Sequence, residues 1–163
     1  MRVRRILADE GAAYREVRLR ALRLAPDAFG TTFEDASARS DAEWEAFARR
    51  SAESETFALF VLDRGDGSLA GLAAISMEEG VPEEGTVFQM WVDEDLRGSA
   101  WASGLLAAAE QHGQSLGARS VTLSVEDDNP RARRFYERAG YSPTGASEGN
   151  RRGGETLEMR RWL

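Results

Sequence analysis

Hydrophobic and polar residues along this chain form two kinds of pattern, which divide it into helices and strands. Four segments have apolar positions three or four residues apart, which predicts helices at residues 10–24, 40–52, 97–116 and 129–140. Seven shorter apolar or alternating segments predict strands at residues 1–8, 56–63, 68–77, 86–93, 119–125, 141–147 and 156–163. The stretch 25–36, between the first two helices, is predicted to be a loop.

The order of these elements indicates the fold class. An early helix pair is followed by a meander of strands and then by strand, helix, strand, helix and two further strands. This order predicts an α/β sandwich built on a mixed sheet. Because the elements follow one another without a linker or a repeat, we expect a single domain over residues 1–163.

The composition excludes several classes of function. No apolar run approaches the roughly 18 residues that a membrane-spanning helix needs, so we expect no membrane partner. A net charge of −7 argues against nucleic acid as a partner. The chain has no cysteine, which predicts a cytoplasmic location and excludes a cysteine nucleophile. With a single histidine, His112, that is expected on a helix surface, we also expect no metal site.

The segment Asp93–Leu106 is the first candidate for chemistry. It passes from a strand into a helix across Arg97-Gly98 and a run of small residues. A helix N-terminus lined with small side chains exposes backbone N–H groups, to which the helix dipole adds partial positive charge. Such a site suits a pyrophosphate. The same residues also suit a helix that packs closely against a sheet, so the segment alone leaves both interpretations open.

The segment Asn129–Tyr141 is the second candidate. Asn129 is a natural N-cap, Pro130 suits the first helical position, and Gly140 suits the helix end. Helix punctuation therefore explains three of its residues. It does not explain the pair Phe135-Tyr136, which follows the asparagine by six and seven positions beside several arginines.

Taken together, the two segments resemble the GCN5-related N-acetyltransferase (GNAT) family. That family has an R/Q-x-x-G-x-G/A loop after its fourth strand, whose places are taken here by Arg97, Ala100 and Ala102. It also has an N-x-x-A-x-x-x-Y segment, which is matched by Asn129, Ala132 and Tyr136. The resemblance implies the GNAT fold. This is a mixed, mostly antiparallel sheet of six or seven strands with about four helices, in which a bulged fourth strand splays from the fifth.

The resemblance also implies an activity. It is the direct transfer of an acetyl group from acetyl-coenzyme A (acetyl-CoA) to a primary amine in a ternary complex. The expected acceptor is a small molecule. The expected oligomeric state is a monomer or a homodimer. Two alternatives stay open: an enzyme that acetylates protein N-termini or lysines, and a non-catalytic module that binds acyl-CoA. Acidic clusters would attract a cationic acceptor but are equally typical of a solvated surface; they comprise Glu78, Glu79, Glu83, Glu84 and Asp93–Asp95.

The residues that the resemblance assigns to acetyl-CoA fall into three groups. Backbone N–H groups of one loop are expected to hold the pyrophosphate: Leu96, Arg97, Gly98, Ser99, Ala100, Trp101, Ala102 and Ser103. Three residues of the preceding strand, Met90, Trp91 and Val92, are expected along the pantetheine arm, where a main-chain N–H faces the thioester carbonyl. The second motif adds Asn129, Ala132, Phe135 and Tyr136. Tyr136 resembles the general acid that protonates the departing thiolate; an ordinary core tyrosine is the alternative.

The general base and the acceptor wall are less strongly specified. Glu34 is favoured as the base because it lies, with Phe33, in the segment that forms the acceptor wall in the family. Glu126, at the end of the fifth strand, is the other candidate, and either glutamate equally suits a solvated surface. Ala100 replaces a usual glycine. This replacement is harmless if the position is helical and weakens binding if the position needs a positive φ.

Overall fold

Seven strands form one mixed sheet in the computed structural model, which describes residues 1–77, 81 and 83–163. The sheet order is β1-β2-β3-β4-β5-β7-β6. The strands are β1 (Arg2–Arg5), β2 (Phe57–Asp63), β3 (Leu69–Ser76), β4 (Glu84–Val92), β5 (Ser120–Glu126), β6 (Ser142–Gly149) and β7 (Glu155–Trp162). β4 and β5 run parallel, and the five other neighbouring pairs run antiparallel. The predicted mixed, mostly antiparallel sheet is therefore confirmed.

Five α-helices and two short 3₁₀ helices accompany the sheet. They are α1 (Gly11–Leu24), η1 (Pro26–Ala28), α2 (Phe33–Ser37), α3 (Asp41–Glu53), η2 (Glu94–Leu96), α4 (Ala100–Ser115) and α5 (Pro130–Arg138). The prediction of a plain loop over 25–36 was wrong, because η1 and α2 lie in it. Thr32 caps α2, since its hydroxyl accepts a hydrogen bond from the Asp35 N–H at 3.0 Å. A helix of five residues is too short to show a clear periodicity.

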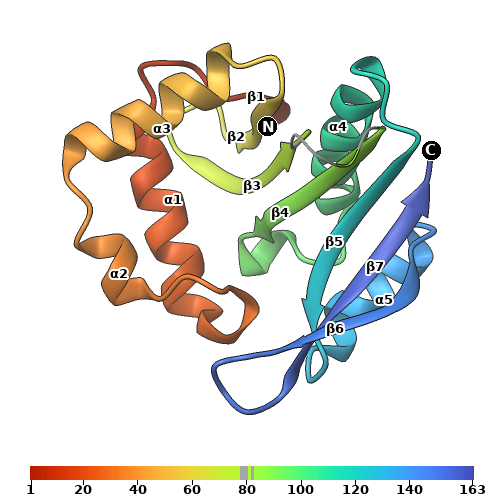
Figure 1. The fold of residues 1–163 in the computed structure, drawn as a ribbon. Coiled ribbons are helices and arrows are strands. Elements are labelled where there is room, and N and C mark those ends of the chain that lie inside the picture. Colours follow the sequence, from red (N-terminus) through yellow and green to blue (C-terminus); the bar gives the residue numbers. More distant parts are fainter. Residues whose placement is uncertain (78–80, 82) are drawn as a thin grey trace.

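The helices cover the two faces of the sheet. Figure 1 shows α1, α2 and α3 on one face, and α4 and α5 on the other. Side chains of a strand alternate between faces, so β2 contributes to both layers. Leu59 packs in the cluster with Tyr14 and Trp44 of α1 and α3, whereas Ala58 packs with Leu106 of α4. In the part of the chain that the structure describes, no helix is both long and apolar enough to cross a membrane.

A bulge interrupts β4 near its middle. Leu72 pairs with Trp91 and Ala74 pairs with Phe88, so the one residue between them on β3 faces two residues on β4. The backbone of Gln89, one of those two residues, has φ of 56°. This left-handed conformation is uncommon for a residue other than glycine. Two consecutive side chains, those of Phe88 and Gln89, therefore face the α1 side.

β4 separates from β5 beyond this point. Their parallel register runs from Glu84 opposite Ser120 to Val87 opposite Leu123, and goes no further. β5 continues to Glu126 against β7, while β4 continues to Val92 against β3. Figure 1 shows the two strands diverging towards their carboxyl ends. The predicted splay between the fourth and fifth strands is confirmed.

Asp63, at the end of β2, links three elements far from this opening. Its carboxylate accepts hydrogen bonds from Arg4 at 2.8 Å and from Arg2 at 3.3 Å, and also from the Gly65 N–H. The Arg4 guanidinium in turn donates to Glu10, just before α1, at 2.6 and 2.7 Å. The hydrogen bond from Arg4 is the largest cause that lowers the pKa of Asp63 to about 2.

Replacing Asp63 with asparagine should lower stability in a pH-dependent way. At neutral pH we expect the free energy of unfolding to fall by about 1–3 kcal/mol, the range for hydrogen bonds to a charged group. The pKa of Asp63 is lower in the folded state, so its stabilisation is complete above about pH 4 and is lost as the pH falls through about 2. The free energies of unfolding of wild type and D63N, measured with urea, should therefore converge as the pH falls over that interval. The exposed Asp9→Asn is the control, and a pH-independent difference would contradict the assignment.

Candidate active site

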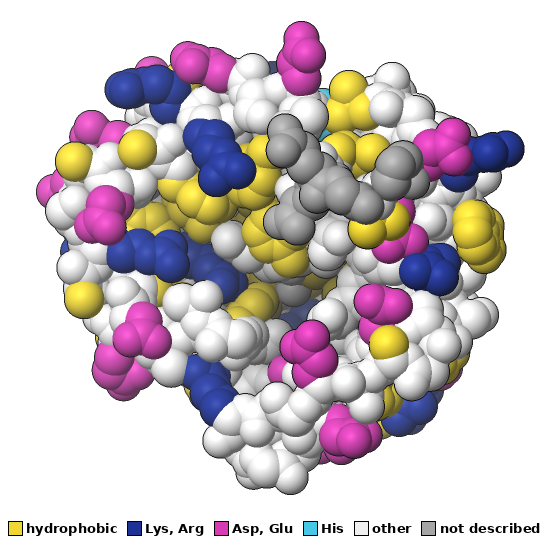
Figure 2. Space-filling view, in the orientation of Figure 1, with side chains coloured by type: hydrophobic (Ala, Val, Ile, Leu, Met, Phe, Trp, Pro, Cys, Tyr) yellow, Lys and Arg dark blue, Asp and Glu magenta, His cyan; other side chains and the backbone are white. Residues whose placement is uncertain are grey.

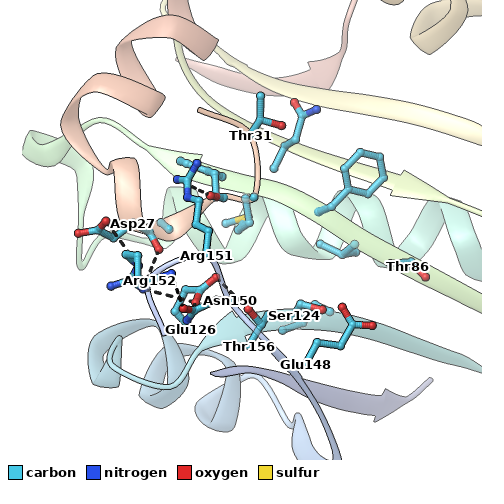
Figure 3. Close-up of a pocket in the computed structure, with 18 of the residues that line it drawn as sticks. Asp27, Thr31, Thr86, Ser124, Glu126, Glu148, Asn150, Arg151, Arg152 and Thr156 are labelled. Atoms are coloured by element: carbon cyan, nitrogen blue, oxygen red, sulfur yellow. Dashed lines mark hydrogen bonds and ion pairs between the residues drawn. The ribbon is translucent and has the colours of Figure 1, made fainter. Parts of the chain in front are cut away.

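A cavity of about 640 Å³ lies where β4 and β5 separate. Its walls come from six places: β4 over residues 86–90, β5 over 123–126, the loop 27–31 after α1, the β6–β7 hairpin, and one side chain each from α1 and α5. Figure 2 shows this face of the molecule hollowed near its centre, with hydrophobic and arginine side chains around the hollow. The close-up in Figure 3 shows two of the lining residues, Thr86 on β4 and Ser124 on β5.

Tyr136 reaches the cavity from α5. It is 7% exposed and packs in the core cluster below β5, where its ring centroid lies 5.2 Å from that of Phe135 and 5.8 Å from that of Tyr141. It also lines the cavity. Burial raises the pKa of the Tyr136 phenol well above its usual value. Tyr136 is therefore both a core tyrosine and a protonated hydroxyl at the cavity wall.

The bulge of β4 is held by α1. The Tyr14 hydroxyl, fully buried in the layer between α1 and α3, donates a hydrogen bond of 2.9 Å to the Gln89 side-chain oxygen. The Tyr14 ring stacks on Phe47 of α3 with ring centroids 4.7 Å apart. The strained residue therefore has a partner that is itself fixed by packing.

Glu126 ties the end of β5 to the β6–β7 hairpin. Its carboxylate accepts hydrogen bonds from Asn150 at 2.6 Å, from Thr156 at 3.1 Å and from Arg152 at 3.4 Å. The Asn150 side-chain oxygen accepts from the N–H groups of Arg152 and Gly154, which fixes the hairpin tip. Figure 3 shows these side chains together below the cavity. Both carboxylate oxygens of Glu126 are thus already occupied, as suits a positioning residue.

The hairpin also contacts the loop after α1. Arg151 donates to the backbone carbonyls of Pro26 and Phe29 at 2.8 and 3.1 Å, and Arg152 forms an ion pair with Asp27 at 3.5 Å. Figure 3 shows both arginines extending from the hairpin towards this loop. Two segments more than 100 residues apart in the chain therefore meet at the cavity.

The first turn of α4 follows directly after the carboxyl end of β4 and η2. Ser99 is its N-cap, since its hydroxyl accepts from the Trp101 N–H at 3.4 Å, and the turn contains no acidic residue. Gly98 has φ of 80°, whereas Ala100 is the first helical residue. The positive φ that the loop needs thus falls on a glycine, and Ala100 occupies a position that suits alanine.

The other side chains of this loop differ in burial. Leu96 is buried, and Trp101 is partly buried against the same cluster, which includes Leu105. The Arg97 guanidinium is 2.6 Å from Glu94. Ala102 is half-buried, and Ser103 is exposed.

The structure brings some of the predicted site residues together and leaves others apart. Met90, Glu126 and Tyr136 line the cavity. Trp91 and Val92 are buried in the core on opposite faces of β4, and Phe135 packs against the core. Asn129 caps α5 by accepting from the Ala132 N–H at 3.1 Å.

The two residues predicted for the acceptor wall lie outside the cavity lining. Glu34 is exposed on α2, and Phe33 packs beneath Arg23, whose guanidinium carbon is 4.8 Å from the ring centroid. Neither Glu34 nor Phe33 is among the residues that line the cavity. The loop residues 27–31 and the hairpin line the cavity instead.

Three cavity residues carried no clear signal in the sequence. Asn150 and Arg151 sit in a glycine-rich turn, and Arg18 is one of four arginines of α1. His112, by contrast, lies outside the cavity, with its ring 3.1 Å from the Glu55 carbonyl; burial lowers its pKa.

The acidic clusters are largely neutralised where the structure describes them. Asp93 pairs with Arg20 at 2.9 Å and with Arg64 at 2.8 Å, and Glu84 pairs with Arg160 at 2.9 Å. Glu78 and Glu79 lie outside the described residues.

Comparison with known proteins identifies the family. The family model described as "Acetyltransferase (GNAT) family" matches residues 19–141, three quarters of the chain. This chain is a GNAT protein. It is 30% identical to the N-acetyltransferase YycN of Bacillus subtilis over 112 residues, which cover 68% of this chain and 72% of YycN. It is also 32% identical to a mycothiol acetyltransferase of Propionibacterium freudenreichii over 119 residues. That match covers 72% of this chain but only 35% of the relative, so the GNAT protein spans about a third of that longer chain.

A solved structure shows the same fold as this GNAT protein. YncA of Salmonella typhimurium, determined with acetyl-CoA, superposes with a TM-score of 0.77 at 17% identity. The match covers 100% of this chain and 94% of YncA. At that identity the likeness establishes the fold, which agrees with the seven-stranded splayed sheet.

Replacing Glu126 with alanine should loosen the hairpin of this GNAT protein. The variant removes the carboxylate that accepts hydrogen bonds from Asn150, Thr156 and Arg152. If the free energy of local opening falls by about 1.4 kcal/mol, the population of the open state rises tenfold. We expect the amides of Arg152 and Gly154 to exchange roughly tenfold faster with solvent, measured by hydrogen exchange. Exchange in α3 should not change. Exposed Ser147→Ala, on the same hairpin, is the control, and equal exchange in E126A and wild type would refute the anchoring role.

Proposed function

We propose that this protein transfers an acetyl group from acetyl-CoA to the primary amine of a small molecule. The observation that carries the proposal is the cavity between the separated strands β4 and β5, lined by a protonated tyrosine and followed by an open helix N-terminus. Membership of the GNAT family supports it. YncA, which has the same fold, was determined with acetyl-CoA.

The residues after β4 fit the donor. The first turn of α4 offers N–H groups without an intrahelical partner, positive dipole charge and no carboxylate, and the exposed Ala100 is small enough for close approach. We assign the pyrophosphate to the N–H groups from Gly98 to Ser103 and the pantetheine arm to the gap beside Met90. When bound, acetyl-CoA supplies an activated acyl group as a thioester.

The chain's own residues then move protons. In direct transfer the ammonium first loses one proton to a base; the amine nitrogen then bonds to the acyl carbon and loses a second proton, the carbon–sulfur bond breaks, and the sulfur gains a proton. Because the chain contains no cysteine, a cysteinyl acyl-enzyme is excluded. A phenol is protonated at neutral pH and burial raises the pKa of Tyr136 further, so its hydroxyl can donate a hydrogen bond to the charge that develops on sulfur.

Among the cavity carboxylates that the structure describes, Glu148 has no ion pair, whereas Asp27 and Glu126 both contact Arg152. We therefore assign to Glu148 the removal of a proton from the incoming ammonium. Glu34 is exposed on α2, outside the cavity lining, which makes it the weaker candidate.

The size of the cavity supports a small acceptor. A volume of about 640 Å³ falls within the roughly 300–1,000 Å³ of small-molecule sites. The contacts of Arg151 with the Pro26 and Phe29 carbonyls also join the two walls over one side.

A carboxylate placed in the first turn of α4 should separate helix stability from donor binding. Ala100→Glu puts a negative charge at a helix N-terminus, which favours the helix by about 0.3–1 kcal/mol. It also repels the pyrophosphate, so we expect acetyl-CoA affinity in calorimetry to fall roughly tenfold or more, while the melting temperature of the free protein holds or rises. Exposed Gln111→Glu, about 16 Å along the same helix, is the control for net charge. Undiminished affinity in A100E would count against the assigned loop.

Deleting the Tyr136 hydroxyl should slow the chemical step. Tyr136→Phe keeps the ring in the core but removes the proton donor, so we expect kcat to fall roughly tenfold to a thousandfold, with acetyl-CoA affinity little changed. A thiol-release assay with a panel of amines measures this. Tyr141→Phe is the matched control, because it deletes the hydroxyl that donates to Glu110 at 2.8 Å and so should lower stability but spare kcat. Full kcat in Y136F, where chemistry limits the rate, would make Tyr136 structural.

A further inference from the structure

Arg18 carries a buried positive charge at the wall of the cavity. The residue is 4% exposed, and its Nη1 has no hydrogen-bond partner among the described residues. Its guanidinium lies over the ring of Phe29, with the guanidinium carbon 4.4 Å from the ring centroid. Both residues line the cavity. A buried guanidinium that lacks a partner is costly, which points to a role beyond packing.

No carboxylate of the described chain compensates this charge. Burial is the main cause that lowers the pKa of Arg18 to about 10. Of the neighbouring groups, Tyr14 raises this pKa and Arg39 lowers it. At neutral pH Arg18 is therefore still cationic. Other arginines of the fold have carboxylate partners, such as Arg4 with Glu10 and Arg161 with Glu110. A second cavity arginine, Arg151, is exposed and donates to backbone carbonyls, so Arg18 is the buried cation of this wall.

The pyrophosphate of the donor does not provide the missing partner. Arg18 belongs to α1, and the open N-terminus assigned to the pyrophosphate belongs to α4. These helices lie on opposite faces of the sheet (Figure 1). Tyr136 reaches the cavity from the face of α5, whereas Arg18 reaches it from the face of α1. A molecule that lies between them has one end at the reacting sulfur and the other at the guanidinium.

We propose that Arg18 binds a carboxylate of the acceptor, so that the acetylated amine belongs to a free amino acid or a small molecule of that kind. This inference rests on the proposed acetyl transfer and names its substrate class. A guanidinium matches a carboxylate with two parallel N–H donors, and one buried positive charge is balanced by one negative charge. A doubly charged phosphate would leave excess negative charge in the same buried place.

Matched amines test the inference. Thiol release from acetyl-CoA is measured with free amino acids and with their carboxamides, which keep the amine but lack the negative charge. For the preferred side chain, kcat/KM should be roughly 10- to 100-fold higher for the free acid. Arg18→Met, which fills the site with an apolar side chain and should fold, is expected to bring this ratio close to one. Arg15→Met, an exposed arginine of the same helix, should keep the wild-type ratio.

Binding without turnover separates this inference from the proposed function. N-acetyl amino acids and their carboxamides are titrated into wild type and R18M by calorimetry. Wild type should prefer the carboxylates by about tenfold or more, and R18M should not. If no amine releases thiol but this preference is found, acetyl transfer fails and the carboxylate site stands. Equal rates and equal affinities for acids and carboxamides would overturn the inference and leave acetyl transfer intact. A preference for O-phosphoethanolamine over β-alanine would also overturn it.

Discussion

The separation of β4 from β5 is the constraint on which the rest of the structure depends. Parallel pairing stops at Val87 and Leu123, because one extra residue enters β4 at the left-handed Gln89 and redirects the backbone that follows. From there each strand has a strand partner on only one side. The cavity occupies the space between them, and α1 fixes its geometry through the hydrogen bond from Tyr14 to Gln89.

An opening within a sheet lets side chains from both faces contribute to one site. Tyr136 comes from α5 and Arg18 from α1, and in a fully paired sheet the strands would lie between them. The two side chains differ in chemistry, since one is a neutral proton donor and the other a cation. The proposed transfer of an acyl group to an amine that carries a carboxylate uses both kinds of group, at different ends of the acceptor. The split sheet therefore brings the proposed proton donor and the proposed carboxylate site to one cavity.

Several features of the cavity are locally unfavourable, and ordinary packing elsewhere offsets them. Gln89 has an uncommon backbone conformation, Arg18 is a buried cation, and Tyr136 is a buried phenol. Local departures from good packing and backbone geometry are typical of functional sites. Away from the cavity, the chain follows the usual rules more closely. Ser40 and Glu43 form a reciprocal cap at α3, and Asp63 has two arginine partners at the sheet edge.

The amino-acid sequence by itself determined most helices and strands, because periodicity and capping involve neighbours in the chain. It also indicated the family, since the two motifs around Arg97 and Asn129 keep their spacing in any conformation. It did not show that Glu34 would lie outside the cavity or that the hairpin at Asn150 would line it. Helical periodicity places Arg18 on the apolar stripe of α1, four positions from both Tyr14 and Leu22, but no local pattern shows that its guanidinium would lie at a cavity. Burial, unlike helix formation, depends on which side of α1 meets the sheet and the Phe29 loop, and only packing between distant segments decides that.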